Sequence, residues 1–598
     1  MAASKKAASI VDDSEAPTIA PSSSSAITDL EKDENQRSVR EPSSGPEENT
    51  GEGRAEDVGE KHNGLARTTT GVSKTGSSLE QTRTREDGSE YPTGVKLGLI
   101  MLALCLSVFL IALDNSIIAT AIPKITDHFH SLDDVGWYGS AYLLTTASLQ
   151  LLFGKFYSFF SIKWVYLVAI FLFELGSLIC GVAPTSTALI VGRAIAGVGS
   201  AGTFSGALII LAHSVPLASR PLYAGAIGSM YGIASVAGPL LGGVFTDEVT
   251  WRWCFYINLP IGAITIVVIA IFFPDPNRAK PKDQTWAERI KEFDPMGTAI
   301  FMPAVICLLL ALQWGGTKYD WDSGRIIALL VIFGIFIIVF LGIQWWQQEN
   351  ATVPPRIFKK RTVWSGSIYS FSVGAAFLSS VYFLPIWFQA VKGATAVHSG
   401  IMNLPMLIST VVMSLIAGAL VTAFGYYTPF MIAGSIFMSI GYGLTSTFEP
   451  NTRSPVWIGY QILAGAGCGF GMQQPMMAVQ TVLDIKDVPT GTAVIVFLQT
   501  LGGALFVSIS QNVFTNKLVE FVRDYAPGLD PNVVLATGAT SIQKTIPSQF
   551  LEGVTLAYND ALTKTFLVSA AMATVSIVGS SLIEWKSVKG KKVEMAMA

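Results

Sequence analysis

Residues 97–122 read LGLIMLALCLSVFLIALDNSIIATAI, an apolar run of 26 residues with a single charged side chain, Asp114. A helix that crosses about 30 Å of hydrocarbon needs roughly 20 largely apolar residues, so this run is long enough to span a membrane. Thirteen further runs of this kind lie near residues 136–157, 163–183, 187–211, 222–245, 255–274, 296–313, 325–346, 364–388, 400–423, 428–447, 456–479, 490–514 and 562–584. The sequence therefore predicts an all-α membrane protein with 14 transmembrane helices.

The composition agrees with a membrane protein. Half of the 598 residues are hydrophobic and only 14% are charged, whereas a soluble protein carries about 25% charged residues. Residues 1–94 differ from the rest, with 18 acidic and 11 basic side chains among many Ser, Thr, Gly and Pro. Such a segment buries too little apolar surface to offset the entropy of ordering. We predict that residues 1–94 form a disordered, acidic cytosolic tail, and we expect no nucleic-acid partner.

Basic residues are unevenly distributed among the loops. They gather in the loops 275–295 and 347–363 and in the C-terminal segment 586–598. Cytosolic loops carry an excess of Lys and Arg, so this pattern predicts that both termini are cytosolic, which requires an even number of spans. The segment 515–560 is then an extracellular loop. We expect the plasma membrane as the location, with a vacuolar or other internal membrane as the alternative.

No motif of a known enzyme class is present, since the chain has no Walker loop, no HExxH and no GxSxG. The five cysteines lie in or beside apolar runs without metal-ligand spacing, so we expect them to be buried small hydrophobic residues. We predict no catalytic residues, no metal site and no cofactor.

Three charged side chains lie inside the apolar runs, namely Asp114, Glu174 and Arg193. An ionisable group at the bilayer centre costs about 2.5–3.5 kcal/mol even on lenient scales, so each should face a cavity or a partner. Asp114 and Arg193 could form a structural ion pair. Alternatively they form a proton site, in which a change of surroundings couples protonation to conformation. Glu174 either serves helix packing or contacts a substrate.

The second half of the chain has only uncharged polar groups at mid-membrane positions. Together with its many aromatic side chains, they suit a cavity for a neutral or weakly polar, ring-bearing molecule, although some of the aromatic rings should face lipid. The predicted substrate cavity comprises Glu174, Tyr382, Gln389, Asn403, Gln473 and Gln474.

Residues 225–243 read GAIGSMYGIASVAGPLLGG and place glycines on two faces of one predicted helix. Small residues let helix backbones approach closely, and Pro239 removes a backbone hydrogen bond and bends the helix. A generic packing helix also carries small residues at this spacing. The combination with a Gly-Pro kink is more specific.

Together these patterns resemble the major facilitator superfamily, and within it the fourteen-span drug:proton antiporters, especially fungal toxin and multidrug efflux pumps. The resemblance covers about residues 95–585. It rests on Leu113-Asp114 with Ala121-Ile122-Pro123, Gly192-Arg193 with Gly197 and Gly199, Gly238-Pro239 with Gly242-Gly243, and WRWCFYINLP at 251–260.

This resemblance implies the major facilitator fold, with six-helix bundles at residues 95–274 and 364–585 and two inserted helices within 275–363. It implies a substrate site between the bundles, reached alternately from each side by rocking. Asp114 would carry the proton and Arg193 would tune its release. Gly238, Pro239, Gly242 and Gly243 match the antiporter motif, which is typical of exporters.

One motif departs from the family pattern. Residues 154–163 read GKFYSFFSIK, with Ser158 where the family has an aspartate and Ser161 where it has a glycine. The contact through which that acid steadies the outward-open state is therefore in doubt. The expected function is a proton-coupled antiporter that exports small lipophilic toxins, secondary metabolites or drugs. The alternatives are a proton-coupled uptake carrier, for example for iron chelates, and a non-transporting membrane receptor.

Overall fold

The computed structural model describes residues 90–131, 134–275, 293–316, 318–537, 539 and 542–589. These residues are almost all helical, and strand-type pairing among them is confined to isolated bridges such as that between Tyr426 and Ser587. The expectations for residues 1–89, for most of the basic loop (276–292) and for residues 590–598 lie outside the described residues.

The first half of the chain folds into a helical bundle. Its helices are α2 (Gly94–Phe129), α3 (Val135–Phe159), α4 (Ile162–Val182), α5 (Ser186–Ser214), α6 (Arg220–Val244), α7 (Trp253–Tyr256) and α8 (Asn258–Phe272). Local signals set some of their ends. The Thr185 hydroxyl accepts a hydrogen bond from the Ala188 amide (3.2 Å) and caps α5, because the first amides of a helix have no partner within it.

The second half forms another bundle. Its helices are α12 (Pro355–Phe358), α13 (Arg361–Ala390), α14 (Ala396–Met402), α15 (Leu404–Phe424), α16 (Thr428–Thr445), α17 (Ser454–Gly471), α18 (Gln474–Val482), α19 (Val488–Tyr525), α20 (Pro531–Ala536), α21 (Ile542–Thr545) and α22 (Ser548–Leu582). Helix α13 packs against α19 and α22, and α17 packs against α15 and α16. The predicted span 456–479 is thus divided into α17 and α18, and Pro475 lies in the first turn of α18.

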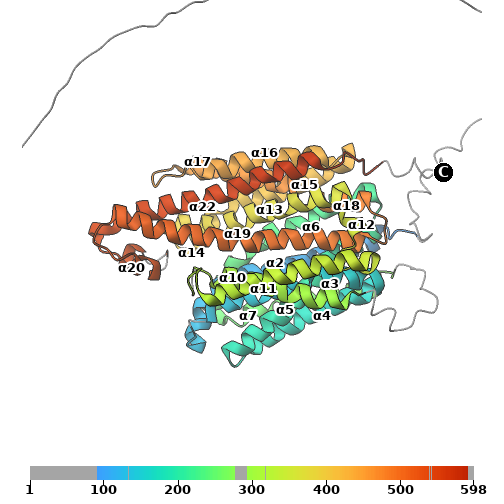
Figure 1. Ribbon diagram of the computed structural model, residues 1–598, viewed down its shortest axis with the longest axis horizontal. Helices are drawn as coiled ribbons and strands as arrows, with labels where there is room; N and C mark the ends of the chain where they lie inside the picture. The colour runs from blue at the N-terminus through green and yellow to red at the C-terminus, as the bar shows by residue number, and fades with distance from the viewer. Residues whose placement is uncertain are drawn as a thin grey trace, which may run out of the picture. The chain divides into compact units, whose positions relative to one another are not determined.

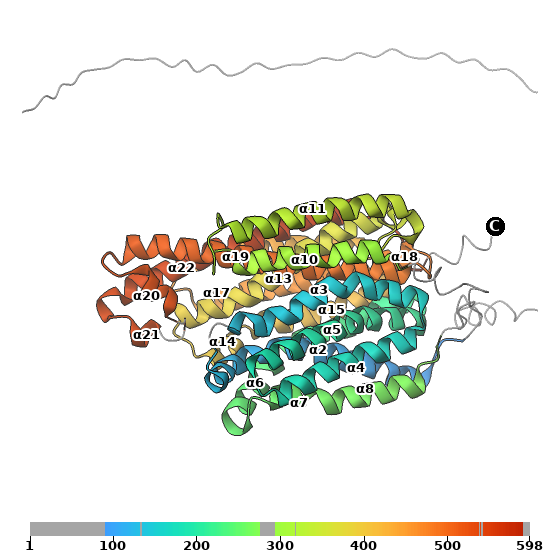
Figure 2. The ribbon, with the colours of Figure 1, turned by 60° about the horizontal axis from the view of Figure 1, so that its bottom comes forward.

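Two further helices, α10 (Pro295–Trp314) and α11 (Gly324–Gln347), lie between the halves in sequence. Helix α10 packs against both α3 and α19, whereas α11 packs on α10 and runs along the edge of the molecule in Figure 2. The Phe301 ring of α10 lies 4.8 Å from the Phe340 ring and 5.3 Å from the Phe497 ring. The inserted pair therefore contacts both bundles.

A buried carboxylate ties the inserted pair together. Asp294 is fully buried and accepts hydrogen bonds from the Gly297 amide (2.6 Å), Gln344 Nε2 (2.6 Å), Gln347 Nε2 (2.7 Å) and the Thr352 amide (2.9 Å). These donors come from the start of α10, the end of α11 and the stretch of chain that follows. Asp294 carries no conspicuous signal in the sequence, because it lies in a polar segment at a helix end.

Eleven helices in the described ranges are long and apolar enough to cross a membrane. Helices α3, α16 and α17 occupy the three other predicted positions; they are long enough but not apolar enough to meet that criterion. The chain is therefore a multi-span membrane protein, and the total of 14 spans remains a prediction.

Helices occupy much of the segment 515–560, which sequence analysis treats as an external loop. Helix α19 continues to Tyr525 and α22 already begins at Ser548. Between them in sequence lie α20, labelled at the left of Figure 1, and α21, labelled at the left of Figure 2. The 38 residues of α19 correspond to about 57 Å of helix, well beyond the roughly 30 Å of a hydrocarbon core. The two helices thus project past the membrane.

The two bundles meet along two seams, α6 against α15 and α3 against α19. We call the end at which α2 begins and α22 ends the termini end. There, apolar side chains of the second half, including Met476, Leu483 and Val488, are fully buried in the same cluster as residues of α2, α4 and α5. The two halves are therefore closed against each other at the termini end.

Candidate functional site

Asp114 and Arg193 meet in the interior of the first bundle. Asp114 lies on α2 and Arg193 on α5, and both side chains are fully buried. Arg193 Nη1 donates to Asp114 Oδ2 and forms an ion pair. Arg193 Nε donates to the carbonyl oxygen of Tyr138 (2.7 Å), and the guanidinium lies over the ring of Tyr142, 4.5 Å from its centroid. The pair therefore links α2, α3 and α5.

The other oxygen of Asp114 has an amide partner. Asn258, at the start of α8, donates through Nδ2 to Asp114 Oδ1 (3.2 Å) and to Ser177 Oγ on α4 (3.1 Å). Asn258 stands within the quoted stretch WRWCFYINLP, but sequence analysis assigned no role to it or to Ser177. An uncharged polar residue at the edge of an apolar run is a weak signal, because many such residues simply bond to their own helix.

Glycines on α5 explain how a guanidinium reaches this interior position. A Cβ at Gly197 would overlap the Tyr142 carbonyl oxygen and Thr145 Oγ1 of α3, and one at Gly192 would lie 2.7 Å from Cys180 Sγ of α4. Because these positions lack a side chain, α5 packs closely against both neighbours. The long arginine side chain between these glycines is thereby enclosed by α2, α3 and α5.

The predicted antiporter motif packs α6 against α2, next to Asp114. A Cβ at Gly238 would overlap Ser116 Oγ and lie 3.0 Å from the Ile117 amide nitrogen, and one at Gly242 would overlap Thr120 Oγ1. Ser116 Oγ donates to the Ala234 carbonyl oxygen (2.9 Å) and joins the two helices. Gly243, in contrast, has no atom within 4 Å of a built Cβ.

The opposite glycine face of α6 contacts the second half. A Cβ at Gly225 would lie 2.6 Å from the Ser414 carbonyl oxygen of α15, and one at Gly228 would overlap Gln473 Nε2. The expectation of packed glycines on two faces is thus confirmed. Helix α6 thus contacts both α2 near Asp114 and the seam between the halves.

The predicted cavity residues do not form one group. Gln473 and Gln474 are buried at the break between α17 and α18, and neither Oε1 has a hydrogen-bond partner among the described residues. Asn403 is buried at the junction of α14 and α15. Gln389 Nε2 donates to Ser399 Oγ (2.9 Å).

Two of the predicted cavity residues lie elsewhere. Tyr382 is exposed on α13, at 55%. Glu174 is buried inside the first bundle, where its carboxyl group lies directly over Gly262 of α8. Glu174 is therefore adjacent to the Asp114 group and separate from the glutamines of the second half.

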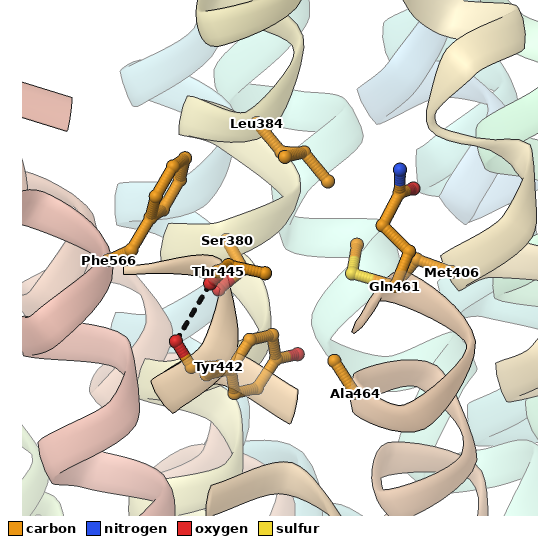
Figure 3. Close-up of a pocket in the computed structure, with 8 residues that line it drawn as sticks. All are labelled: Ser380, Leu384, Met406, Tyr442, Thr445, Gln461, Ala464 and Phe566. Atoms are coloured by element: carbon orange, nitrogen blue, oxygen red, sulfur yellow. Dashed lines mark hydrogen bonds between the residues drawn. The ribbon is translucent and has the colours of Figure 1, made fainter. Parts of the chain in front are cut away.

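A narrow pocket lies within the second bundle, where α13, α15, α16, α17 and α22 converge (Figure 3). Its lining includes Ser380, Met406, Gln461 and Phe566, and the space between them is too small for a water molecule. Thr445 Oγ1 in this lining donates to the Tyr442 carbonyl oxygen (2.8 Å). Because these helices all belong to one half, this pocket is not the cavity predicted between the bundles.

The motif at residues 154–163, in which Ser158 replaces the aspartate of the family pattern, lies at the termini end, where the two halves are closed against each other. Ser158 Oγ is 3.3 Å from Thr490 Oγ1 in the first turn of α19, and a Cβ at Gly154 would lie 2.6 Å from Ala493 Cβ. The contact between α3 and α19 is therefore retained, with two hydroxyl groups in place of a carboxylate.

Charged contacts beside this seam involve the inserted pair. Lys155 Nζ donates to the Asn350 carbonyl oxygen (3.2 Å), and Arg356 donates to both oxygens of Asp487 (2.9 and 3.1 Å) and to Glu349. The hydrogen bonds from Arg356 to Asp487 and Glu349 raise the pKa of its guanidinium. These contacts link the inserted pair to α3 and to the start of α19.

Comparison with known proteins agrees with this architecture. The family model of the Major Facilitator Superfamily matches residues 104–507. The "MFS-type efflux pump MFS1" of Trichophyton rubrum is 61% identical over 508 residues, which cover 85% of this chain and 95% of that protein. "Efflux pump aflT" of Aspergillus parasiticus is 50% identical over 504 residues, covering 84% of this chain and 98% of that protein.

Solved structures share the fold at low identity. The human organic anion transporter MFSD10 aligns with a TM-score of 0.52 at 12% identity, over 80% of this chain and 99% of that one. A double-tryptophan mutant of XylE aligns with a TM-score of 0.52 at 13% identity, over 84% of this chain and 98% of that one. Since the family model spans both halves and the relatives match over most of their length, the chain belongs to the major facilitator superfamily and is a membrane transporter rather than an enzyme.

Proposed function

We propose that this transporter is a proton-coupled antiporter that exports small lipophilic compounds across the plasma membrane, with both termini in the cytosol. The observation that carries the proposal is the fully buried ion pair of Asp114 and Arg193, held between three helices of the first bundle. The positive charge of the loops beside the termini supports the orientation.

A buried ion pair of this kind responds strongly to protonation. Removal of one charge of such a pair typically costs about 3–5 kcal/mol, because the other charge is left without compensation. Protonation of Asp114 removes its negative charge and leaves Arg193 with the Tyr138 carbonyl and the Tyr142 ring. A proton bound at Asp114 therefore favours a rearrangement of α2 and α5, and this rearrangement is the coupling step that we propose.

The contacts of α6 provide a route from the proton site to the seam between the halves. Its Gly238 face packs on α2 beside Ser116, two residues from Asp114, and its Gly228 face packs on Gln473. Movement of α2 thus reaches the residues that border the interface between bundles. This fits a mechanism in which the bundles rock around a central site.

The substrate class is argued from the relatives and from the chemistry of the seam. "Aspyridones efflux protein" of Neocamarosporium betae is 53% identical over 521 residues, and efflux pumps recur among the relatives. Gln473 and Gln474 supply amide oxygens without partners among the described residues, in otherwise apolar surroundings. A lipophilic molecule with a hydroxyl or amide donor would satisfy such oxygens.

The test uses purified protein in liposomes, an imposed pH gradient and rhodamine 6G as a fluorescent lipophilic probe. Asp114→Asn keeps the shape of the side chain and removes the charge, so we expect loss of gradient-driven transport in a protein that still inserts into the membrane but is less stable, because Arg193 is left without its carboxylate. Asp322→Asn, which changes an exposed carboxylate between α10 and α11, is the matched control and should transport normally. Wild-type rates in Asp114→Asn would refute the proposed coupling.

A further inference from the structure

Glu174 is a buried carboxyl group that takes no part in the ion pair of Asp114 and Arg193. It is 7% exposed, and neither of its oxygens has a hydrogen-bond partner among the described residues. An ionised carboxylate without a partner in an apolar interior costs several kcal/mol, and such groups neutralise instead. Glu174 therefore carries a proton in this conformation.

Asp114 is in the opposite protonation state. It is the carboxylate of the ion pair with Arg193 at one oxygen, and it accepts a hydrogen bond from the Asn258 amide at the other. One guanidinium neutralises one carboxylate at a time. The three groups Asp114, Arg193 and Glu174 thus have a net charge of zero in this state, with a single proton shared by two acids.

Helix spacing places Glu174 one turn from the polar side chains that hold Asp114. Glu174 and Ser177 lie three residues apart on α4 and therefore share a face. Likewise Asn258 and Gly262 lie four residues apart on α8. Ser177 meets Asn258 through a hydrogen bond of 3.1 Å, and one turn further along, the Glu174 carboxyl group lies against Gly262. The acid of α4 is thus one helical turn from the amide that holds Asp114.

Unused hydrogen-bonding capacity is present in this group. Arg193 Nη2 is a buried donor without a partner, and Asn258 Oδ1 is a buried acceptor without a partner, among the described residues. Gly262 provides the room for the carboxyl group, because a Cβ there would overlap Glu174 Oε1. The side chains around Asp114 can therefore rearrange their hydrogen bonds, because a donor on Arg193 and an acceptor on Asn258 are still unused.

We propose that Glu174 is a second proton-carrying residue of the transport cycle and alternates with Asp114 as the protonated acid. When Asp114 takes up a proton, its bond to Arg193 weakens, and the guanidinium becomes available to stabilise the Glu174 carboxylate. Glu174 then releases its own proton, so one proton enters the group and one leaves. The charges change from −1, +1 and 0 on Asp114, Arg193 and Glu174 to 0, +1 and −1, and the net charge stays zero.

Other titratable groups of the first bundle do not replace Glu174 in this role. Cys180 of α4 and Tyr142 of α3 are fully buried, and Cys180 Sγ lies 3.6 Å from the Leu189 carbonyl oxygen, to which it donates. Tyr256 of α7 donates to the Gly181 carbonyl oxygen (2.8 Å). Thiols and phenols are weak acids that stay protonated at neutral pH in such surroundings, so Glu174 is the group that exchanges a proton with Asp114.

The inference rests on the proposed antiport, and its first test is independent of transport. Infrared spectroscopy of purified protein in lipid nanodiscs at neutral pH resolves the carbonyl stretch of a protonated carboxyl group, which shifts in D2O. We expect that Glu174→Gln loses this band and that Glu174→Asp keeps it at a shifted frequency. Asp114→Asn imitates the protonated aspartate, so it should weaken the band, because Arg193 is then available to stabilise the Glu174 carboxylate. Persistence of the complete band in Glu174→Gln would overturn the proposal.

The second test measures rhodamine 6G transport in liposomes. Glu174→Gln imitates the permanently protonated form, so we expect loss of transport driven by a pH gradient and retention of probe exchange without a gradient. The control is Thr265→Val. It changes a fully buried hydroxyl that bonds to the Ile261 carbonyl oxygen of its own helix, α8, and it should behave as wild type.

The two variants separate this inference from the function on which it rests. Gradient-driven transport at wild-type rates in Glu174→Gln, together with its loss in Asp114→Asn, overturns only the second proton carrier. Wild-type rates in both variants overturn the antiport proposal as well. Loss in both, with exchange retained in Glu174→Gln, supports both proposals.

Discussion

The glycine motif of α6 makes a prediction whose magnitude follows from the structure. In Gly238→Ala, the new Cβ would lie 2.7 Å from Ser116 Cβ and 3.0 Å from the Ile117 amide nitrogen. Overpacking of this kind costs about 1–3 kcal/mol, and displacement of Ser116 loses its bond to Ala234, worth about 1 kcal/mol. Alanine recovers about 1 kcal/mol of helix propensity. The net destabilisation is about 1–3 kcal/mol.

Gly243 of the same motif is the matched control. A Cβ there meets no atom within 4 Å, so Gly243→Ala should be neutral or stabilise the protein by up to about 1 kcal/mol. The assay is the midpoint temperature at which detergent-solubilised protein ceases to elute as a monodisperse peak. We expect a lower midpoint for Gly238→Ala and an unchanged or higher one for Gly243→Ala.

A double variant identifies the contact responsible. Ser116→Gly removes the side chain that the Cβ introduced by Gly238→Ala would overlap, so the combined effect should be smaller than the sum of the single effects by at least about 1 kcal/mol. Equal losses in Gly238→Ala and Gly243→Ala would refute the packing argument, and strictly additive effects with Ser116→Gly would do so as well. The motif would then act through backbone flexibility instead of through close contact with α2.

Two further changes test the contacts around the inserted helices and the termini end. Asp294→Ala leaves several buried donors, including Gln344 Nε2 and the Thr352 amide, without an acceptor. Since each such group costs about 1–3 kcal/mol, the elution midpoint should fall far more than in Asp322→Ala. An equal effect of the two changes would contradict the role of Asp294 in joining α10 and α11. Ser158→Asp places a carboxylate beside the first turn of α19, where the helix dipole contributes about 0.3–1 kcal/mol. We expect a more populated termini-closed state, measured as slower labelling of a cysteine introduced at Val488, and faster labelling would contradict this interpretation.

The sequence indicated the charged residues of the site and the pairing of Asp114 with Arg193, but not their uncharged partners. Asp114, Glu174 and Arg193 were found because a charge inside an apolar run is expensive and therefore conspicuous. Asn258 and Ser177 were not, because neutral polar residues are common at the ends and interiors of membrane helices. The role suggested for Glu174 also changes with its position, since only the packing of α4 on α8 brings it beside the Asp114 group and away from Gln473.

The limits of the helices likewise follow only in part from the sequence. The hydrophobic runs predicted where helices lie within the membrane, but α19 and α22 extend beyond it into a polar segment, where hydropathy carries no signal. Asp294 was missed for a related reason. Its donors come from Gln344, Gln347 and Thr352, which lie far along the chain and converge only when α10 and α11 pair.

The sequence alone predicts the membrane class, the approximate positions of the spans and the charges within them. This is because the preference of a side chain for water or for lipid is a property of that residue type. Only tertiary packing decides which charges and amides become neighbours, which face of α6 meets which half, and which end of the molecule is closed. These depend on contacts between residues far apart in the chain, among them pairs more than 100 positions apart such as Ser116 with Ala234 and Asp114 with Asn258, and no local pattern encodes such a contact.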